Sequence, residues 1–331
     1  MSEFTPQDAE RFSEFINSHK FFFIVGHKEP DGDCIASCLG IAAILDHFNK
    51  PYQLLSAGPF KRAEIKAFED QFSNTMIFQS QEERDHTGLI ITDCSELSRL
   101  GEIDGDFKGF DTFNIDHHKT SESDNGESNI QSFIDSHSPA CAILVQKFYE
   151  TLIGPLPSDL AKTIFFGFCT DTGYFRFLDE THGNALDDAA RLVHYGANPK
   201  DTYKKVNSGR PYSTRKLLGI LLSKAERYLD GRLVITYESM SDTKKYGQEG
   251  RDSDALYNLM LSSEGVEAVV FLRQETENTC TGGFRSQDKI DVSAIAAKFG
   301  GGGHKNASGM SCEGRVENLI PQIVKEFARI I

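Results

Sequence analysis

Short apolar runs alternate with helix-like stretches through the first half of the chain, and this alternation constrains the fold more than any other feature of the sequence. The apolar runs predicted as strands are residues 21–26, 52–57, 75–78, 88–93 and 110–116. Apolar residues recur at helical spacing in residues 34–48, 61–70, 139–152 and 158–168. Strands that alternate with helices indicate βαβ units. The sequence therefore predicts an α/β domain with a parallel sheet covered on both faces.

The pattern changes after about residue 183, where polar helical segments continue to residue 215. Beyond them a second α/β unit is predicted, with strands near 231–237, 267–274 and 279–286 and helices near 292–299 and 317–330. A chain of 331 residues is long enough for about two domains. We therefore predict a first domain over residues 1–185, a helical connector over 186–215 and a smaller second α/β domain over 216–331.

Charge and cysteine usage exclude several classes of protein. The chain has 35 basic and 49 acidic residues and a net charge of −14, which argues against a basic face for long duplex nucleic acid. Its seven cysteines are scattered and form no CxxC pair, as expected for reduced thiols in a cytoplasmic protein. No apolar run approaches the ~20 residues that span a bilayer, so no membrane partner is expected.

Acidic and histidine residues follow the predicted strands at the points where these strands should end. They are His27, Asp31 and Asp33 after the first run, Asp93 and then Asp116, His117 and His118 after later runs, and Asp171 after an apolar helical stretch. The carboxyl ends of parallel strands share one edge of the sheet, where the crossover loops open a crevice. We therefore expect these side chains to converge.

Each residue alone has a simpler interpretation. Asp33 by itself would be a helix N-cap, and a lone His-His pair is more often surface or hydrogen-bonded core than a ligand pair. Residues 31–33 resemble the start of a calcium loop, but Ile35 and Ala36 occupy positions that need a ligand and a glycine. Together, however, the carboxylates would repel one another unless cations lie among them. A mixed imidazole and carboxylate set suits Mn²⁺, Zn²⁺ or Fe²⁺, and its size predicts two ions that share one carboxylate.

The order of these motifs resembles the DHH phosphoesterase superfamily. It runs from HxxPDGD at residues 27–33, through Asp93 in "DCSELSRLG", to Asp116-His117-His118 and then "DTGYF". The C-terminal stretch "FRSQDKIDVSAIAAKFGGGGHKNASG" (284–309) resembles the accompanying DHHA1 domain. The compact length and the glycine motif are most similar to the nano-RNases. These enzymes hydrolyse very short oligoribonucleotides and dephosphorylate 3′-phosphoadenosine 5′-phosphate.

The resemblance implies a role for each residue of the site. One metal ion would be held by His27, Asp31 and Asp93, and the second by Asp33, Asp93, His117 and Asp171. Asp93 would bridge the two ions and be essential for catalysis. His118 would face the substrate phosphate as a donor or acid, and Asp116 would orient an imidazole from the second shell of residues.

The glycine-rich module implies the contacts with substrate. Glycines allow the backbone to approach a ligand closely, and an arginine binds phosphate through a two-pronged fork. The expected substrate-binding residues of the second domain are Arg285, Ser286, Gly301, Gly302, Gly303 and His304. The family places this module across an interdomain cleft from the metals.

The expected protein is thus a two-metal phosphoesterase with Mn²⁺ as cofactor, and with Mg²⁺ or Co²⁺ as alternatives. It would convert short oligoribonucleotides and dinucleotides to nucleoside 5′-monophosphates, and 3′-phosphoadenosine 5′-phosphate to AMP. A RecJ-like single-strand exonuclease, a cyclic-dinucleotide phosphodiesterase or an inorganic pyrophosphatase of the same superfamily stays open, as does a nucleotide-binding sensor without catalysis. The oligomeric state also stays open, a homodimer included.

Overall fold

The computed structural model describes residues 4–94, 96–118, 130–248, 251–287 and 289–331. The chain divides into two compact units, Met1–Gly209 and Arg210–Ile331. The first unit contains all the acidic and histidine residues expected to bind metal, and the second contains the glycine-rich segment.

The first unit is built on a five-stranded sheet in which every pair of neighbouring strands is parallel. The strands are β1 (Phe21–Val25), β2 (Tyr52–Leu55), β3 (Thr87–Thr92), β4 (Asp111–Asp116) and β5 (Ile130–Ile134). Their order is β2-β1-β3-β4-β5. From β1 the chain continues to β2 at one edge of the sheet, whereas from β3 it continues through β4 to β5 at the other edge. The strand order therefore reverses between β1 and β3, and this place is the topological switch point of the sheet. Open α/β sheets bind ligands at the carboxyl ends of strands at such a point.

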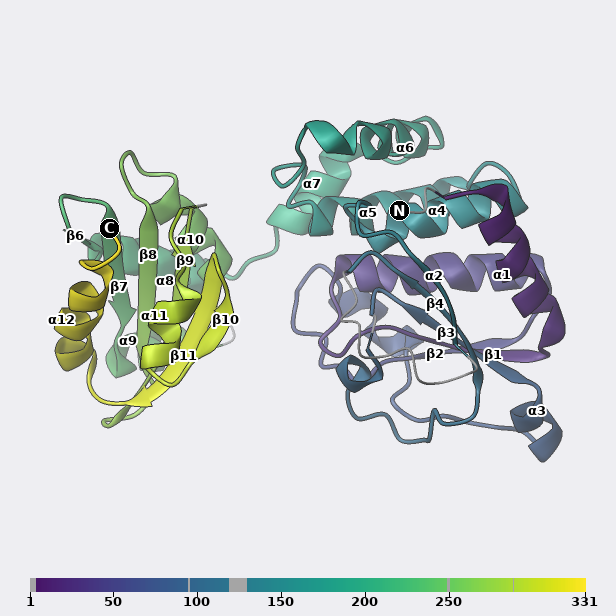
Figure 1. Cartoon of the computed structure of the whole chain (residues 1–331), viewed down its shortest axis with the longest axis horizontal. Helices are drawn as coiled ribbons and strands as arrows, with labels where there is room; N and C mark the ends of the chain where they lie inside the picture. Colours follow the sequence, from purple (N-terminus) through teal and green to yellow (C-terminus); the bar gives the residue numbers. More distant parts are fainter. Residues whose placement is uncertain (1–3, 95, 119–129, 249–250, 288) are drawn as a thin grey trace. The chain divides into compact units, whose positions relative to one another are not determined.

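Helices cover one face of this sheet (Figure 1). They are α1 (Pro6–Ser18), α2 (Gly32–His47), α4 (Cys141–Leu152) and α5 (Ser158–Asp171). The strand residues Phe22 and Ile24 pack with these helices, whereas Phe23 and Val25 belong to the apolar cluster on the other face. Loop residues such as Met76 cover that second face. The parallel sheet is therefore confirmed. Among the described residues its long helices all lie on one face, and the other face, which the βαβ pattern predicted to be covered by helices, is covered by loops and short helices instead.

Helix α2 is buried along both sides, between the sheet and the helices α4 and α5. Glycines make this close packing possible. A Cβ atom at Gly40 would lie 2.5 Å from Val145 Cγ1, and one at Gly167 would lie 2.6 Å from Ala36 Cβ. Because no side chain separates the helices, the end of α5 lies beside the start of α2.

Two segments differ from the prediction. Residues 61–70 contain no α-helix, only the 3₁₀ helix η1 (Lys66–Gln71). Of residues 61–65, only Ile65 is buried in the small cluster with Ile35, Phe60 and Phe166, so this segment buries no helical face. Residues 75–78 form no strand beyond a single bridge. There the side chain of Gln53 binds the backbone of Thr75 and Ile77 at 2.9 and 3.1 Å, in place of a neighbouring strand. Three further short helices of this unit are α3 (Gln81–Asp85), η2 (Leu97–Leu100) and η3 (Glu180–His182).

The predicted connector over residues 186–215 is not a separate segment. It contains α6 (Gly183–His194), α7 (Pro199–Asn207) and the beginning of α8 (Tyr212–Ser223). Both α6 and α7 pack against α5 in the first unit, and Arg191 of α6 forms an ion pair with Glu150 of α4 at 2.9 Å. In contrast, α8 packs on strands and helices of the second unit. The change from one unit to the next therefore falls between Gly209 and Arg210.

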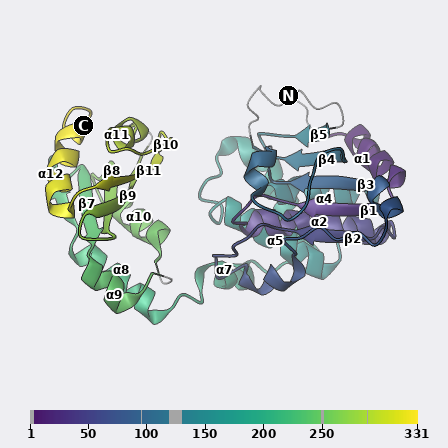
Figure 2. The ribbon, with the colours of Figure 1, turned by 90° about the horizontal axis from the view of Figure 1, so that it is seen from below.

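The second unit contains a six-stranded mixed sheet in the order β10-β11-β9-β8-β7-β6. Its strands are β6 (Glu226–Tyr228), β7 (Leu233–Glu238), β8 (Ala268–Gln274), β9 (Thr279–Ser286), β10 (Gly302–His304) and β11 (Ala307–Glu313). One face packs on α11 (Ser293–Lys298) and α12 (Val316–Phe327), and the other on α8 and α10 (Ser253–Leu261), with α9 (Met240–Tyr246) beside α8 (Figure 2). The expected second α/β unit is present, and the hairpin β10–β11 was not predicted.

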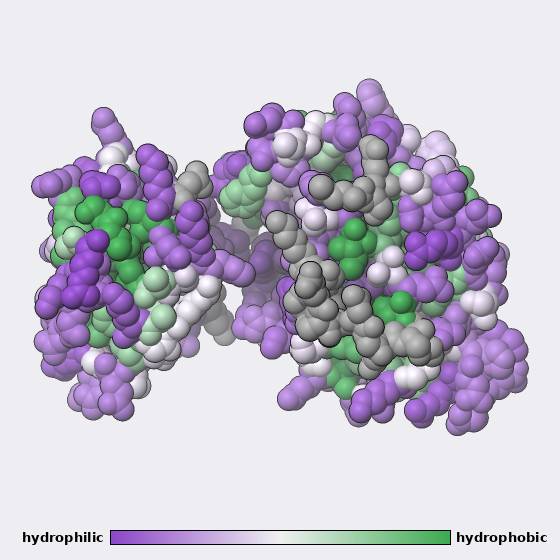
Figure 3. Space-filling model, in the orientation of Figure 1, coloured by the Kyte–Doolittle hydropathy of each residue, from purple (hydrophilic) through white to green (hydrophobic). Residues whose placement is uncertain are grey.

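The surface and the cysteines agree with the composition. The face shown in Figure 3 is mostly hydrophilic on both units. All seven cysteines are free, and six of them are buried. Within the ranges that the structure describes, no helix combines the length and the apolar character that a membrane span requires.

Candidate metal centre

The carboxyl ends of β1, β3 and β4 bring the acidic and histidine residues together. His27 follows β1 by two residues, Asp93 follows β3 directly, and Asp116 is the last residue of β4. These three strands are neighbours in the order β1-β3-β4. The residues therefore converge at the switch point of the sheet, as predicted from their positions after apolar runs.

Asp93 lies at the middle of this cluster. Its side chain is nearly buried, with 2% of the residue exposed. Asp93 Oδ2 lies 3.5 Å from His27 Nε2, and Asp93 Oδ1 lies 3.3 Å from His117 Nε2. The backbone of Asp93 is left-handed, with φ of 56°, a conformation that is uncommon outside glycine and concentrated at functional sites. One carboxylate thus faces both histidines, each with a different oxygen.

His117 joins Asp93 to two further carboxylates. Its Nε2 lies 3.5 Å from Asp171 Oδ2 and 3.9 Å from Asp33 Oδ2. Asp171 is the last residue of α5 and so reaches the site from a helix, not from a strand. Asp33 accepts hydrogen bonds from the backbone N–H groups of Cys141 and Ala142 at 2.6 and 2.9 Å. The buried Asp33 carboxylate therefore stabilises the beginning of α4 as well as facing His117.

On the other side of Asp93, His27 faces Asp31. The distance between His27 Nε2 and Asp31 Oδ1 is 3.8 Å. Asp31 is the N-cap of α2 and accepts from the backbone N–H groups of Asp33 and Cys34, each at 3.1 Å. The N-cap interpretation that the sequence allowed for Asp33 therefore belongs to Asp31.

Both imidazoles are held in the orientation that metal-binding histidines adopt. His27 Nδ1 donates to the carbonyl of Lys28 at 2.8 Å, and His117 Nδ1 donates to the carbonyl of Ser138 at 3.1 Å. Because a carbonyl only accepts, the proton is on Nδ1 and the lone pair of the neutral ring is on Nε2. Each Nε2 lone pair then points at carboxylate oxygens, which is unfavourable unless a cation or a second proton lies between them.

Two atoms at the centre of the cluster lack hydrogen bonds. Asp93 Oδ1 and His117 Nε2 are buried, and neither has a hydrogen-bond partner among the residues that the structure describes. Buried polar atoms without partners are rare in native proteins and call for a specific explanation. Oxygen and imidazole nitrogen together are the donor set that divalent transition metals prefer. The residues present therefore fit a divalent metal centre.

The carboxylates also change the protonation of both imidazoles. Burial alone lowers the pKa of His27, but hydrogen bonds and attraction from Asp31 and Asp93 outweigh it and raise the pKa to about 10. Burial lowers the pKa of His117 as well, and the surrounding carboxylates, Asp93 first, reverse the effect and raise it to about 10. Burial and then the charge of Asp93 hold the pKa of Asp33 well above its usual range. The site thus strongly favours positive charge, as protons or as cations.

His118 and Asp116 form a separate pair at the edge of the cluster. The side chain of His118 is 38% exposed, whereas Asp116 is fully buried. Asp116 Oδ1 accepts from His118 Nδ1 at 2.8 Å and from the backbone N–H groups of His117 and His118 at 2.7 and 3.1 Å. The imidazole that Asp116 orients is therefore that of His118, and His118 Nε2 is left for a ligand.

In the second unit, Arg285 and His304 lie in one row across three adjacent strands. Ala307 of β11 pairs directly with Arg285 of β9 on one side and with His304 of β10 on the other. Residues paired in this way present their side chains on the same face of a sheet. The Arg285 guanidinium lies over the ring of Tyr257 from α10, 4.6 Å from its centroid. Two groups that can bind phosphate thus share a face, and Tyr257 is a neighbour that the sequence pattern did not indicate.

The glycines of this region serve two purposes. Gly301 and Gly303 are required by the fold, because their Cβ atoms would lie 2.0 Å from Gly309 O and 2.7 Å from Ala307 O. Gly302 has nothing within 4 Å of a Cβ position, and it pairs with Gly309 on the face of Arg285 and His304. Of the predicted glycine contacts, the structure therefore favours Gly302.

Ser286 does not join this face. Its residue is 8% exposed, and its hydroxyl donates to the carbonyl of Ile290 at 2.6 Å. Side chains alternate along a strand, so Ser286 points away from the side of Arg285. The hydroxyl is used within the fold, which argues against the predicted contact with substrate.

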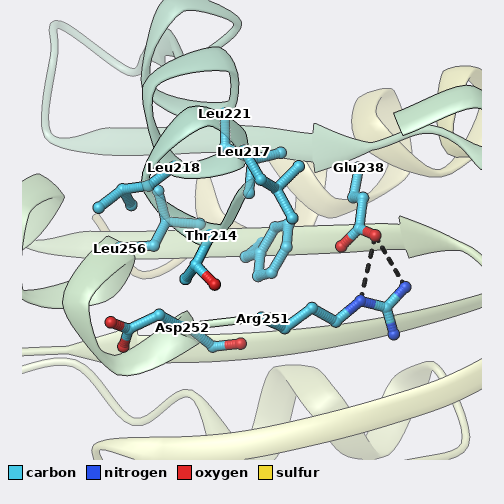
Figure 4. Close-up of a pocket in the computed structure, with 10 residues that line it drawn as sticks. Thr214, Leu217, Leu218, Leu221, Glu238, Arg251, Asp252 and Leu256 are labelled. Atoms are coloured by element: carbon cyan, nitrogen blue, oxygen red, sulfur yellow. Dashed lines mark hydrogen bonds and ion pairs between the residues drawn. The ribbon is translucent and has the colours of Figure 1, made fainter. Parts of the chain in front are cut away.

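A small pocket in the second unit has a different character. It is lined by leucines of α8 and α10 and by Thr214, with about 230 Å³ of empty space that is partly open to solvent (Figure 4). Its charged residues have ion-pair partners: Arg251 contacts the fully buried Glu238 at 2.9 Å, and Asp252 contacts Arg215, which does not line the pocket, at 3.0 Å. The pocket contains none of the expected metal-binding or phosphate-binding residues, so it is not the candidate site.

Comparisons with known proteins agree with this arrangement. Residues 21–168 match the model of the DHH family, N-terminal domain, and residues 231–331 match that of the DHHA1 domain. Each match lies within one of the two compact units. The acidic and histidine cluster therefore lies in the DHH part, apart from Asp171 just beyond it, and the row of Arg285 and His304 lies in the DHHA1 part.

Relatives cover most of the chain. It is 30% identical over 312 residues to the bifunctional oligoribonuclease and PAP phosphatase NrnA of Thermus thermophilus, across 93% of this chain and 90% of that protein. It is 24% identical over 311 residues to the cyclic-di-AMP phosphodiesterase PdeA of Listeria monocytogenes, but spans only 45% of that protein. Among solved structures, an exopolyphosphatase-related protein from Bacteroides fragilis has the same fold, with a TM-score of 0.82 and 23% identity over 99% of this chain and 98% of that one.

Proposed function

The chain belongs to the DHH family with a C-terminal DHHA1 domain and is a phosphoric ester hydrolase, and from this premise we propose that its substrates are short oligoribonucleotides and 3′-phosphoadenosine 5′-phosphate. The products are nucleoside 5′-monophosphates and AMP. The relative from Thermus thermophilus supports this choice, because its name states both activities and the match extends over nearly the full length of both proteins.

The observation that carries the proposal is the position of Asp93 between two histidines. One of its oxygens lies 3.5 Å from His27 Nε2 and the other 3.3 Å from His117 Nε2. One cation would be held by His27, Asp31 and Asp93, and the second by Asp33, Asp93, His117 and Asp171. We assign Mn²⁺ as the cofactor because the donors are oxygen and imidazole nitrogen. When bound, the ions supply the charge that makes water acidic near neutral pH and that stabilises the developing negative charge on the phosphoryl oxygens.

The remaining residues of the cluster handle the proton and the orientation of the phosphate. His118 is the most exposed of the histidines at this site, and Asp116 fixes its ring through Nδ1. When the ring is protonated on both nitrogens, His118 Nε2 can donate a hydrogen bond to a phosphate oxygen or a proton to the leaving oxygen. Asp116 keeps this ring in one orientation. In the second unit, Arg285 and His304 would bind a second phosphate of the substrate. That substrate binds in a cleft between the two domains remains a prediction.

Related activities are the main alternatives. A cyclic-dinucleotide phosphodiesterase is favoured by the match to the Listeria monocytogenes protein, although that protein is about twice as long as the matched part. A RecJ-like exonuclease requires tracking of a long strand, which usually uses a basic groove with aromatic platforms, whereas the net charge of this chain is −14. A sensor without catalytic activity would not require two histidines that face the two oxygens of one buried carboxylate. A cytoplasmic location is supported by the seven free cysteines.

One assay separates these functions. Purified protein with Mn²⁺ is offered a dinucleotide, a 5-mer, a 24-mer, a cyclic dinucleotide and 3′-phosphoadenosine 5′-phosphate side by side. We expect the fastest release of mononucleotide from substrates of about 2–5 nucleotides, because long strands gain little from a non-basic exterior, and release of phosphate from the last compound. Equal rates per end on the 24-mer would favour the exonuclease, preference for the cyclic compound would favour the phosphodiesterase, and no turnover would favour the sensor.

A further inference from the structure

We propose that the thiol of Cys34 is an additional ligand at the metal position formed by His27 and Asp93, and that it gives this position an affinity for thiophilic cations. The inference rests on the metal centre of the proposed function. It concerns a residue that neither the motif positions nor the assignment of the two ligand sets includes.

The geometry of the residues carries the proposal. One ligand atom each of His27, Cys34 and Asp93 lies within 4.8 Å of the other two. Two ligands on opposite sides of one cation are separated by about 4.0–4.6 Å, twice a bond length of 2.0–2.3 Å, so displacements of less than about 1 Å bring all three atoms within reach of a single ion. Cys34 is 1% exposed and Asp93 is 2% exposed, so the sulfur reaches this position from the interior.

The chain keeps a space for this sulfur at the end of β1. A Cβ atom at Gly26 would lie 2.2 Å from Cys34 Sγ, so any side chain at position 26 would displace the thiol. Cys34 is in the first turn of α2, one residue after Asp33, and Asp31 caps that turn by accepting from the Cys34 backbone N–H at 3.1 Å. The thiol is therefore fixed by the same local structure that positions Asp31 and Asp33.

The burial of Asp93 also favours a cation beside it. Asp93 is buried and its Oδ2 faces His27 Nε2 at 3.5 Å, whereas its Oδ1, which has no hydrogen bond among the described residues, faces His117. A buried carboxylate with this geometry needs positive charge nearby. The neighbouring thiol is the softest donor within reach, and sulfur ligands select Zn²⁺, Co²⁺ and Cd²⁺ over Mn²⁺ and Mg²⁺. When the sulfur–cation bond forms, the thiol proton passes to solvent.

The test uses Co²⁺ and Cd²⁺ as probes on the full chain. Cobalt bound through sulfur gives an intense near-ultraviolet charge-transfer band that oxygen and nitrogen ligands do not give. We expect this band in the wild-type protein, its loss in Cys34→Ser, and its retention in Cys38→Ser. Cys38 is the matched control, because it lies one turn later on α2 and its Sγ contacts Thr92 Oγ1 at 3.2 Å, which a serine can also do.

Competition between Cd²⁺ and Mn²⁺ gives a second measurement. We expect the ratio of Cd²⁺ affinity to Mn²⁺ affinity to be about tenfold or more lower in Cys34→Ser than in the wild type. Changes around metal ligands lower metal affinity by roughly 10- to 100-fold, which is a comparable effect. If the variant fails to fold, ¹¹³Cd NMR of the wild-type protein tests the proposal instead. Sulfur ligation shifts the ¹¹³Cd resonance strongly downfield, so we expect a downfield resonance. Absence of the cobalt band in the wild type, or its persistence in Cys34→Ser, would overturn the proposal. Because these measurements detect binding alone, their outcome is separate from that of the nucleotide assay.

Discussion

Asp93 combines a burial and a conformation that cost free energy in isolation. Its residue is 2% exposed, its φ is 56°, and one of its oxygens has no hydrogen bond among the described residues. A left-handed non-glycine residue costs roughly 1–3 kcal/mol, and an unpaired buried carboxylate costs more. The proposed pair of cations would remove the second cost and would account for the burial of this carboxylate.

The first prediction concerns this residue. Asp93→Asn preserves the shape of the side chain and removes the charge that both metal positions share. We expect bound Mn²⁺ to fall at both positions, by more than the roughly 10- to 100-fold loss of affinity that removal of an outer partner causes, and we expect turnover to be abolished. Metal analysis after gel filtration measures the first effect. Asp159→Asn, at a side chain that is 98% exposed, is the control. A fully active Asp93→Asn enzyme would contradict the two-metal assignment.

The second prediction concerns protons. His27 and His117 have pKa values raised to about 10, and burial together with nearby carboxylates raises the pKa of Asp171 to about 6. At pH 7 both imidazoles of the metal-free protein therefore carry protons that cations must displace. Metal affinity should fall as the pH falls from about 8 to 6, by up to about a hundredfold per pH unit for two displaced protons, and more steeply where Asp171 takes up its proton.

Calorimetry of Mn²⁺ binding in buffers of different ionisation enthalpy measures this proton release. The same raised pKa values set the sign for stability. A folded-state pKa above the unfolded value contributes stability that is complete below about pH 6.5 and is lost as the pH rises toward 10. The metal-free protein should therefore lose stability over that range. Metal binding without release of protons would show that the imidazoles are neutral before the ion binds.

At the scale of elements, the site depends on how α2, α4 and α5 meet. Asp33 in the first turn of α2 binds the N–H groups at the start of α4, and Gly167 of α5 has Asp33 Oδ1 3.2 Å from its Cβ position. The absence of a side chain at Gly167 lets the end of α5 carry Asp171 to within 3.5 Å of His117. Helix packing, and not the sheet alone, thus brings together the residues of the proposed second ligand set.

The third prediction follows from this packing. Gly167→Ala places a Cβ atom 2.6 Å from Ala36 Cβ, so α2 and α5 must separate. We expect the free energy of unfolding to fall by about 1–3 kcal/mol and Mn²⁺ affinity to fall with it, because Asp33 and Asp171 move apart. Denaturant unfolding and metal titration measure the two effects.

Gly219→Ala is the matched control. Gly219 is inside α8, where a Cβ atom meets nothing within 4 Å. Alanine there should stabilise the protein by about 0.5–1 kcal/mol through helix propensity alone. A Gly167→Ala variant as stable as the wild type and with unchanged metal affinity would show that the helices tolerate the separation.

At the scale of the whole molecule, the chain divides the chemistry between its two units. The carboxylates and histidines of the metal centre belong to Met1–Gly209, and the row of Arg285 and His304 belongs to Arg210–Ile331. Contributions of the second unit should therefore depend on the substrate and leave metal binding unchanged. This separation distinguishes residues that bind substrate from residues that hold ions.

The fourth prediction uses this difference. Arg285→Ala should lower kcat/KM for a dinucleotide and for 3′-phosphoadenosine 5′-phosphate by about ten- to a hundredfold, the value of a charge-assisted contact of roughly 1.5–3 kcal/mol. Bound Mn²⁺ should not change, and a simple aryl phosphate ester, which has no second phosphate, should lose far less activity. Arg232→Ala, which breaks an exposed pair with Glu267, is the control. Equal losses on both kinds of substrate would assign Arg285 to the fold.

Local sequence determined most of the elements and the candidate residues of the site. Strands β1 and β3 and helices α2, α4 and α5 follow from apolar runs and periodicity, which depend only on near neighbours in the chain. Polar residues directly after buried strands could be recognised as candidates because such positions face a crevice in any parallel sheet. Residues 61–70 and 75–78 were mispredicted because their structure depends on distant residues. The first segment packs on a small apolar cluster, and the backbone of the second binds the side chain of Gln53.

Tertiary structure alone decided how the residues act together. Nothing in the sequence states that Asp31 caps α2 while Asp33 binds the start of α4, that Ser286 points away from Arg285, or that Cys34 Sγ lies over Gly26. Each of these depends on strand order, on the direction of side chains along β9, or on the distance between helix axes. These quantities are set by the packing of segments that are up to about a hundred residues apart, and packing is a property of the whole fold.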